Sequence, residues 1–445
     1  MEQMIMEGFS KGFLHRFCAN VSGGQSPPWT RVSSEKGAEM PPPSILIQTP
    51  PEAEKETETA PRVVSSEPWS PQPRAVVIDM GSGTCKAGFA GLARPMYAVA
   101  TLVGCQPKKP APQGAPPELE TFVGEAARAR PELALVQPLR HGVVVDWEAA
   151  ELIWRHLLER DLGVMPSEHP LLFSDAPFGP ATNREKLVEV AFENLGAPGM
   201  FVASQPVLAV YAHGRISGLV VETGHGVSYA VPVFQGYPLG HATQRLDLAG
   251  AQLDAFLAQK MHLGPGAPLS QRDLAAVEYV KHHHCYVATA DGHAGQDAEA
   301  AQTLKLPDGR SVTLGPELRQ CPELLFRPPD MPGLAPVGLP AMASAPCSRC
   351  PPEARADEVA RNVLLCGGSS LFPGFESRFG GRAAAGRRLR SRGSPPAHVV
   401  AGPSRHLAVW VGGSILASLR AFQSCWVLKA QYEEQGPHIV YRKCY

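Results

Sequence analysis

The chain has 445 residues, a hydrophobic fraction of 44% and a formal net charge of −1. This length allows one large domain or two to three ordinary ones, and the apolar content is enough for a sizeable core. The near-neutral charge argues against a general nucleic-acid or membrane-surface role, and no apolar run approaches the roughly 20 residues that a membrane helix needs.

Residues 1–73 are predicted to be a disordered extension. They hold eleven prolines and many Ser and Glu residues, without a sustained hydrophobic period. Such a segment cannot bury enough apolar surface to offset the entropy of ordering it. The first residues carry acids and lack the clean apolar stretch of a secretory signal, so no signal is expected there.

Two later segments, 76–86 and 219–229, repeat one pattern: an apolar strand, an acid, G-x-G and a second strand. Glycines in such a turn allow a tight backbone, and successive N–H groups there can hold an anion. The acids Asp79 and Glu222 would hold a hydrated divalent cation beside phosphates, and Lys86 would neutralise phosphate charge. We therefore expect a duplicated fold that binds phosphates from both sides. Ordinary hairpin turns are the alternative.

Helices and strands alternate around these two segments. An amphipathic helix is predicted over 146–162 with Asp146 as its N-cap. Thr182 and Glu185 predict a capping box that opens another helix. A third glycine turn, in 363–374, follows a buried strand and would offer backbone to a nucleoside. This mixture predicts an α/β protein.

Cysteine and histidine clusters are not expected to form metal sites. The ten cysteines lack the spacing of a disulfide scaffold, which favours a reducing intracellular compartment. Cys347 and Cys350 form one CxxC with no second pair nearby, whereas zinc usually needs four ligands. Consecutive residues of the run 282–285 point in different directions on a helix, so they cannot all reach one ion. Cys285 is expected to be buried.

Several motifs in the same order make the chain from about 74 to 445 similar to actin over essentially its full length. The matching segments are 79–91, 141–147, 182–186, 245–250, 409–419 and 439–445. Within that family, the proline-rich extension and 104–110 resemble the divergent testis actin-like proteins.

The resemblance implies an actin-like two-lobed fold, a duplicated mixed five-stranded sheet with flanking helices, around a nucleotide cleft. Lobe one would hold about 74–213 and 407–445, and lobe two about 214–406. The cleft would take ATP with magnesium or calcium. The implied contacts with phosphates, nucleoside and metal are residues that match actin's motifs. They are Asp79, Gly81, Ser82, Gly83 and Lys86 in the first loop; Glu222, Thr223, Gly224, Gly226 and Val227 in the second; Gly250, Lys281, Gly367, Gly368, Leu371 and Phe372 at the nucleoside; and Asp79 and Glu222 at the metal, through water.

Gln205 matches the glutamine that positions the attacking water, but its surroundings depart from actin's pattern. Glu222 and His225 each replace an Asp, and Tyr229 replaces a histidine near that water. Three nucleoside contacts are also changed, namely His282, Phe372 and His406. These changes are compatible with phosphate binding, but they predict weak nucleoside recognition and slow or absent hydrolysis.

Segments that contact neighbours in an actin filament are rewritten with proline. Five prolines lie in 105–120, and 327–353 is proline-rich too. Proline removes backbone donors and stiffens the chain, while filament growth requires one contact to repeat. Long homopolymers are therefore not expected. The Arg-rich 379–394 reads as a helix-poor, solvated loop, with an acidic protein or nucleic acid as the alternative contact.

A groove for a partner's amphipathic helix is a further expectation of the resemblance. The residues that match its lining are Tyr211, Tyr237, Ile415, Leu416 and Leu419. The alternative is that these side chains simply pack the core.

Together these features predict a non-catalytic cytoskeletal protein of sperm or spermatid, in the cytoplasm and the sperm head cytoskeleton by resemblance. Its partners would be other proteins, with actin-like proteins of the sperm head as candidates, and not nucleic acid. Alternatives are a nuclear actin-related subunit of a chromatin complex, which the Arg-rich stretch favours, and a slow ATPase. A sugar kinase would need an added substrate-binding insertion, which the cleft segments lack.

Overall fold

The computed structural model describes residues 73–107, 119–261, 270–288, 301–329, 337–350, 359, 361–388 and 398–444. The predicted extension lies outside these residues except for Pro73. The same holds for most of the proline-rich 105–120, since 108–118 are not among them.

The first sheet is built around a fully buried strand, β1. Its strand order is β19 (Val427–Leu428), β10 (Gly199–Ser204), β9 (Leu171–Asp175), β1 (Val76–Met80), β2 (Thr84–Phe89) and β3 (Tyr97–Ala100). β1 runs parallel to β9 and antiparallel to β2, with which it forms a hairpin. The apolar run of β1 is explained by these neighbours, because a strand with pairing partners on both sides and cover on both faces has no solvated face.

The second sheet repeats this arrangement. Its order is β13 (Tyr237–Pro238), β12 (Ser228–Phe234), β11 (Gly218–Thr223), β17 (Asn362–Cys366) and β18 (His398–Val400), and β14 (Gln244–Leu246) also pairs with β12. β11 runs antiparallel to β12 in a hairpin and parallel to β17. The predicted duplication is confirmed. Each sheet has six strands in the described chain, and the predicted five remain when the two-residue strands β19 and β13 are set aside.

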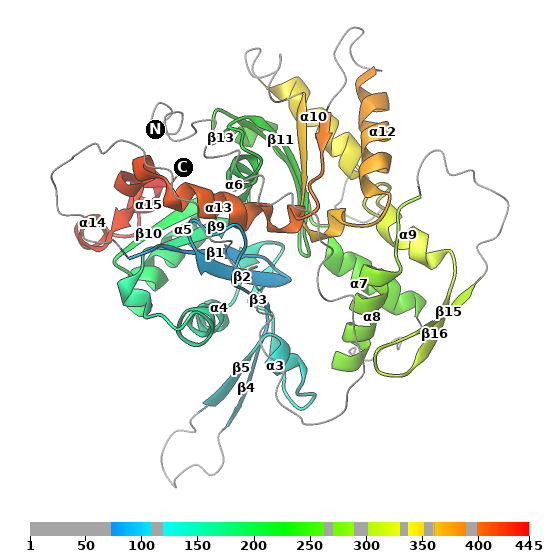
Figure 1. Cartoon of the computed structure of the whole chain (residues 1–445), viewed down its shortest axis with the longest axis horizontal. Coiled ribbons are helices and arrows are strands. Elements are labelled where there is room, and N and C mark those ends of the chain that lie inside the picture. The colour runs from blue at the N-terminus through cyan, green and yellow to red at the C-terminus, as the bar shows by residue number, and fades with distance from the viewer. Residues whose placement is uncertain are drawn as a thin grey trace, which may run out of the picture.

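Helices flank both sheets (Figure 1). Around the first sheet lie α3 (Glu125–Arg128), α4 (Trp147–Arg155), α5 (Ala181–Glu189), α6 (Gln205–Ala212), α14 (Lys429–Gln435) and α15 (Ile439–Lys443). Around the second lie α7 (Gly250–Lys260), α8 (Gln271–His283), α9 (Glu317–Glu323), α10 (Leu339–Arg349) and α12 (Phe375–Arg388). Small ladders complete the fold: β4 (Val103–Pro107) with β5 (Leu119–Val123) and β6 (Leu135–Val136), β7 (Leu139–Arg140) with β8 (Val143–Val144), and β15 (Gln302–Lys305) with β16 (Ser311–Leu314).

Alternate residues of the second sheet face two different cores. In β11, Val220 joins the cluster that contains the first sheet, whereas Leu219 and Val221 join the cluster under α7 to α10. This alternation follows from the period of two residues in a strand. The second sheet therefore separates the two cores.

The chain returns to the first sheet through α13 (Ala408–Ser418), which is buried along almost its whole length. Trp410 Nε1 donates a hydrogen bond of 3.0 Å to the carbonyl of Val77 in β1. α13 also crosses α6 so closely that a Cβ at Gly412 would lie 1.8 Å from the carbonyl oxygen of Leu208. A contact between residues far apart in sequence thus joins the C-terminal segment to the N-terminal sheet, while the lobe boundaries at 213 and 407 stay a prediction.

Two local predictions are corrected. The capping box of Thr182 and Glu185 is absent: α5 starts at Ala181 behind Pro180 without a side-chain cap, so Thr182 is already inside the first turn. Glu185 instead accepts a hydrogen bond of 2.7 Å from the hydroxyl of Tyr441. The Arg-rich segment is helical as far as Arg388, because α12 is anchored by buried aromatic residues one turn apart; residues 389–394 lie outside the described chain.

In the described part of the chain, no helix combines the length and the apolarity that a membrane crossing requires. Those residues likewise hold no group of three or more His, Cys, Asp or Glu side chains arranged for a metal ion. Cys285, next to the histidine run, is buried as expected.

Candidate functional site

The first glycine turn places a lysine beside a buried carboxylate. Asp79 and Lys86 face each other in the register of the β1–β2 hairpin. Lys86 Nζ donates to Asp79 Oδ2 at 2.9 Å, and Ser174 Oγ, from the end of β9, donates to Asp79 Oδ1 at 2.8 Å. Asp79 is only 4% exposed. Both carboxylate oxygens therefore have donors from the protein itself.

The second glycine turn places a tyrosine where the first has the lysine. Glu222 and Tyr229 are partners in the β11–β12 register, just as Asp79 and Lys86 are in the first hairpin. The Tyr229 hydroxyl donates to Glu222 Oε2 at 2.5 Å. The two hairpins are alike in backbone, but the first supplies a cation and the second a neutral hydroxyl.

The two turns touch each other. A Cβ at Gly83 would lie 2.7 Å from the His225 side chain, and one at Gly226 would lie 2.5 Å from Ser82 Oγ. His141 bridges the same junction, with Nδ1 at 2.7 Å from the Gly226 carbonyl oxygen. Glycine is required at both positions, because any side chain there would force the turns apart.

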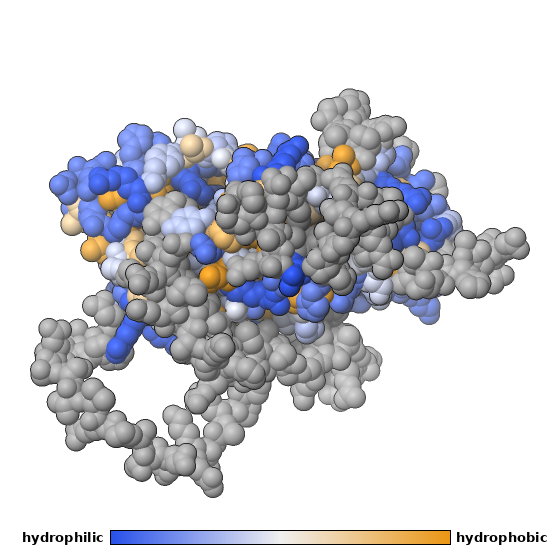
Figure 2. Space-filling view, turned by 90° about the horizontal axis from the view of Figure 1, so that it is seen from above, coloured by the Kyte–Doolittle hydropathy of each residue, from blue (hydrophilic) through white to orange (hydrophobic). Residues whose placement is uncertain are grey.

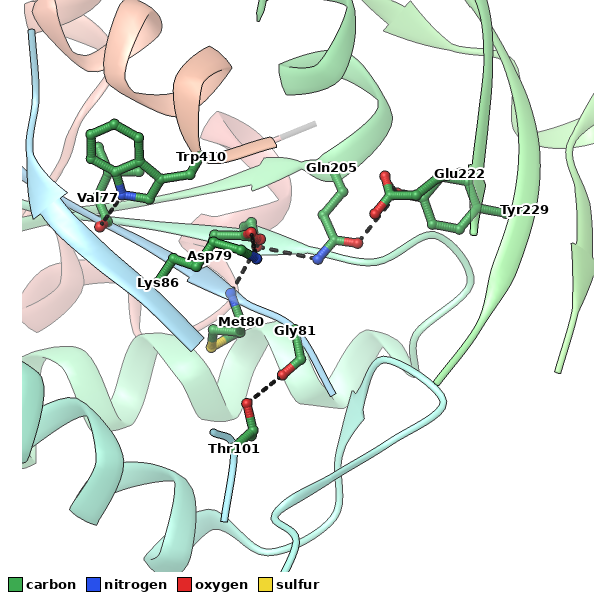
Figure 3. A network of polar contacts seen from close by, with 11 residues as sticks. Val77, Asp79, Met80, Gly81, Lys86, Thr101, Gln205, Glu222, Tyr229 and Trp410 are labelled. Carbon is green, nitrogen blue, oxygen red and sulfur yellow. Dashed lines mark hydrogen bonds and ion pairs between the residues drawn. The ribbon is translucent and has the colours of Figure 1, made fainter. Parts of the chain in front are cut away.

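A chain of hydrogen bonds connects the two turns through α6 (Figure 3). Gln205 is the first residue of α6, and its Nε2 donates to Ser174 Oγ at 3.2 Å. The hydroxyl of Tyr229 lies 3.4 Å from Gln205 Oε1. The amide nitrogen of Gln205 is thus held by Ser174, whereas the Tyr229 hydroxyl, whose one proton goes to the nearer Glu222, only lies beside the amide oxygen.

Burial sets the charge state of these groups. Burial raises the pKa of Glu222 to about 7, against a smaller lowering effect of the Tyr229 hydrogen bond. Burial also raises the pKa of Tyr229 well above its ordinary value. Desolvation opposes the charge of Lys86, but the adjacent Asp79 outweighs it and raises the lysine pKa. At neutral pH Lys86 is therefore charged and Tyr229 is neutral, whereas burial favours the protonated form of Glu222.

The predicted nucleoside residues lie in two different environments. Gly367, at φ +86°, has no room for a side chain, because a Cβ would be 2.2 Å from the Thr223 carbonyl oxygen. Gly250 opens α7, and its N–H donates to the carbonyl of Gly224 at 3.0 Å. Gly367 and the start of α7 therefore pack directly against the backbone of the second glycine turn. Beyond it, Leu371 is 39% exposed.

Three further predicted contacts point inwards. Phe372 belongs to the core cluster under the second sheet, and Val227 is buried in the other core. Lys281 Nζ donates to Asp254 Oδ2 at 2.7 Å, and this lysine is nearly buried. Lys281 therefore already has a counter-charge, which sequence reasoning missed because Asp254 lies on another helix, α7.

Other residues of the site were missed too. Arg245, in β14, donates to the carbonyl oxygens of His141 at 2.6 Å and Pro177 at 2.8 Å. Arg128 of α3 donates to both carboxylate oxygens of Glu278 in α8, at 2.7 and 3.0 Å. Both arginines join segments of the first and second halves of the chain. Only Arg245 had a sequence signal, since it lies in the matched motif 245–250.

The five residues of the predicted partner groove do not line one surface. Four of them are buried, namely Tyr211, Ile415, Leu416 and Leu419, and only Tyr237 is substantially exposed, at 40%. This burial favours the alternative that they pack the core. Where the face in Figure 2 is coloured, hydrophobic residues lie as separate spots among hydrophilic ones.

The two carboxylates keep acceptor capacity for a divalent cation held through water. Asp79 accepts one hydrogen bond on each oxygen, from Lys86 and from Ser174, and Tyr229 donates to Oε2 of Glu222. A carboxylate has about four lone-pair sites, so Asp79 and Glu222 both have lone pairs left for the water shell of a hydrated cation.

Comparison with known proteins places this geometry in a family context. The family model described as Actin matches residues 70–273 and 270–445. Actin-like protein 9 of Homo sapiens is 67% identical over 379 residues, which covers 84% of this chain and 89% of that protein. Actin-like protein 9 of Bos taurus is 66% identical over 379 residues, which likewise covers 84% of this chain and 89% of that protein. Actin-like protein 7A of Macaca fascicularis is 39% identical over 396 residues, 88% of this chain and 89% of that protein.

Proposed function

This chain belongs to the actin family, and we propose that it is a structural protein of the cytoskeleton that acts through protein contacts and not through catalysis. The observation that carries the proposal is the engagement of Gln205. Its amide nitrogen is bonded to Ser174, and its oxygen faces the hydroxyl of Tyr229. That hydroxyl gives its one proton to Glu222, and it lies beside the amide oxygen, where a water in line with a terminal phosphate would have to sit.

We further propose that the cleft retains ATP binding. The two glycine turns lie in contact, so the backbones of both hairpins meet at one place, and glycine turns of this kind are able to hold an anion through their N–H groups. Lys86 supplies a permanent positive charge there. The nucleoside end contributes less, because Lys281 is paired with Asp254 and Phe372 is in the core. ATP should therefore bind mainly through its phosphates and only weakly to moderately.

For the place of action we propose the cytoplasm and cytoskeleton of sperm or spermatid, with other actin-like proteins of the sperm head as candidate partners. The support is the identity to the actin-like proteins 9 and 7A and the resemblance of the sequence to testis members of the family. Immunolocalisation tests this directly. Nuclear staining would favour a chromatin complex instead.

Phosphate release from ATP by the purified full chain tests the non-catalytic proposal. We expect release at least about tenfold slower than that of actin measured in the same buffer, which corresponds to about 1.4 kcal/mol in the barrier. A matched sample of actin is the positive control. Release at actin's rate would overturn the proposal.

A further inference from the structure

We propose that Cys285 and Cys321 form a modification site, at which a small-molecule disulfide such as oxidised glutathione converts the two thiols into one intramolecular disulfide bond. The bond joins the C-terminal end of α8 to α9. Both thiols are free in the structure and belong to the core under the second sheet. The inference adds a covalent chemistry to the proposed function and does not depend on nucleotide binding.

The first step is the position of the two cysteines. α8 ends at His283, and Cys285 follows two residues later, whereas Cys321 lies within α9. The N–H of Tyr286 donates to the carbonyl oxygen of Leu318 at 3.3 Å. Leu318 lies one turn before Cys321, on the same face of α9. The backbone thus brings the residue that follows Cys285 against the turn of α9 that carries Cys321.

The second step is the contact between the two sulfur atoms. Both side chains are almost completely buried. A hydrogen bond between the thiols is the main effect that raises the pKa of Cys321, ahead of burial. Thiols that already touch need little backbone movement to become bonded, whereas cysteines more than about 7 Å apart at Cα cannot be bridged without it. Cys105 and Cys444, by contrast, have a threonine hydroxyl and a backbone N–H as partners.

The third step is access for the oxidant. Cys285 lies beside the last turn of α8, where His282 and His283 are exposed. Helix ends open locally at a small free-energy cost, and such an opening brings the Cys285 thiol to solvent. Cys321 instead lies against the backbone of α7, with Sγ 3.8 Å from the carbonyl oxygen of Leu253. Cys285 is therefore the thiol that an oxidant meets first.

The fourth step is the exchange reaction. The Cys285 thiolate attacks one sulfur of oxidised glutathione, releases one glutathione and forms a mixed disulfide. This removes the neighbouring thiol that raised the pKa of Cys321. Cys321 then loses its proton, attacks the Cys285 sulfur and releases the second glutathione. Two protein thiols are oxidised to one disulfide, and one oxidised glutathione is reduced to two glutathione molecules.

Disulfide mapping of the full chain tests the inference. The native protein is incubated with oxidised glutathione, its remaining thiols are alkylated after denaturation, and its peptides are identified by mass spectrometry. We expect a peptide pair joined through Cys285 and Cys321, with the loss of both thiol hydrogens. The exposed Cys105 should carry glutathione, which shows that the oxidant has acted. Free or separately modified thiols at Cys285 and Cys321 in that sample would overturn the inference.

Two variants define the route, and the mapping of the wild type does not depend on either of them folding. In Cys321→Ala, Cys285 should stop at the mixed disulfide with glutathione, because the second thiol is missing. In Cys105→Ala, which removes an exposed thiol, the bond between Cys285 and Cys321 should form as in the wild type. A Cys321→Ala protein whose Cys285 stays unmodified would contradict the order of attack.

Thermal unfolding shows whether the bond fits the native structure. The oxidised wild type should unfold about 3 °C or more above the reduced protein, because the bond restricts the unfolded chain. This difference should be absent in Cys321→Ala. An unchanged or lower unfolding temperature after oxidation would mean that the bond forms only by distorting the fold, and it would overturn a native modification site.

Discussion

Lys86 and Tyr229 occupy equivalent places in the two hairpins, and this one difference decides the chemistry of the cleft. Each is the cross-strand partner of an acid at the end of the preceding strand. The ammonium holds a charge that can face phosphates. The phenol instead ties Glu222 to the region of Gln205. Lys86 thus serves phosphate binding, whereas Tyr229 lies beside Gln205, the residue that would position the attacking water.

Tyr229→His should raise the rate of phosphate release. The substitution removes the hydroxyl that lies 3.4 Å from Gln205 Oε1 and so frees that oxygen for a water. We expect an increase of about tenfold or more. Phosphate release under saturating ATP is the measurement, with Tyr237→His as a control because Tyr237 is exposed and outside the cleft. An unchanged rate in the folded Tyr229→His protein would mean that the phenol does not limit turnover.

His225→Gln should reduce the loss of folding stability that occurs when the pH falls. Burial and then the charge of Lys281 lower the His225 pKa to about 4, from an ordinary value of 6.5; Arg128 and His282 also oppose its protonation, while Glu278 favours it. Because the folded pKa is depressed, the folded chain is fully stable above pH 6.5 and loses stability as the pH falls from 6.5 to about 4.

For this imidazole, which is 27% exposed, the loss is about 1–3 kcal/mol after solvent screening. Thermal unfolding at pH 7.5 and pH 5 measures it. The wild-type difference should shrink in His225→Gln but not in His438→Gln, whose imidazole is 74% exposed. Equal differences in wild type and His225→Gln would contradict the assignment.

At the scale of elements, the ion pair between α3 and α8 joins segments from opposite sides of the cleft. Arg128 and Glu278 are 150 residues apart and form a two-pronged contact. Both side chains are 27% exposed, so the pair is only partly screened by solvent. This ion pair holds α3 close to α8.

Arg128→Glu should therefore loosen the cleft. Repulsion between the introduced carboxylate and that of Glu278 would replace the contact, and we expect amide exchange in α3 and α8 to accelerate by about threefold to thirtyfold. Hydrogen exchange followed by mass spectrometry measures this. The swap Arg128→Glu/Glu278→Arg should restore slow exchange, and if it does not, the effect is not due to the ion pair.

The crossing of α6 and α13 is a very close helix contact, and it tolerates no side chain at Gly412. A Cβ there would lie 1.8 Å from the Leu208 carbonyl oxygen, which is backbone and cannot rotate away. Gly412→Ala should cost about 3 kcal/mol or more, or prevent soluble expression. The neighbouring Gly413→Ala meets a side chain of Val77 at 2.8 Å and should cost less. Chemical denaturation ranks the two, and the reverse order would contradict the packing argument.

At the scale of the whole molecule, the chain has the fold of its family, and the resemblance places its proline-rich segments 105–120 and 327–353 where actin subunits meet in a filament. Part of the proline-rich 327–353 forms α10, while the loop between β4 and β5 lies outside the described residues. The few large apolar side chains exposed in the described chain are spread over many elements. A repeating contact needs one continuous complementary surface on each side.

The purified full chain should therefore remain free of long filaments. The measurement is negative-stain electron microscopy in a magnesium and potassium buffer that polymerises actin, with actin alone as the positive control. Sedimentation of the same samples provides the quantity in the pellet. Long filaments of the pure protein would show that the altered segments still allow self-assembly.

The sequence by itself determined the duplicated pattern and the residues that carry it. Strand, acid and glycine turn are local features, because a turn that needs glycine is written in the chain whatever packs around it. Both hairpins and the buried Cys285 follow from such local patterns. Two local predictions were wrong. α5 begins directly after Pro180, so the expected capping box does not form. The expected loop is instead the helix α12, which two buried phenylalanines anchor.

Only the tertiary structure decided which side chains satisfy one another. Ser174 meets Asp79 from 95 residues away, Lys281 meets Asp254 from another helix, and four groove residues turn into the core. Hydrogen bonds and ion pairs of this kind depend on distances between separate elements. The helix and strand periodicities of a sequence do not encode those distances. The state of the cleft follows from these long-range contacts, since they determine which carboxylates, lysines and amides remain available to a nucleotide.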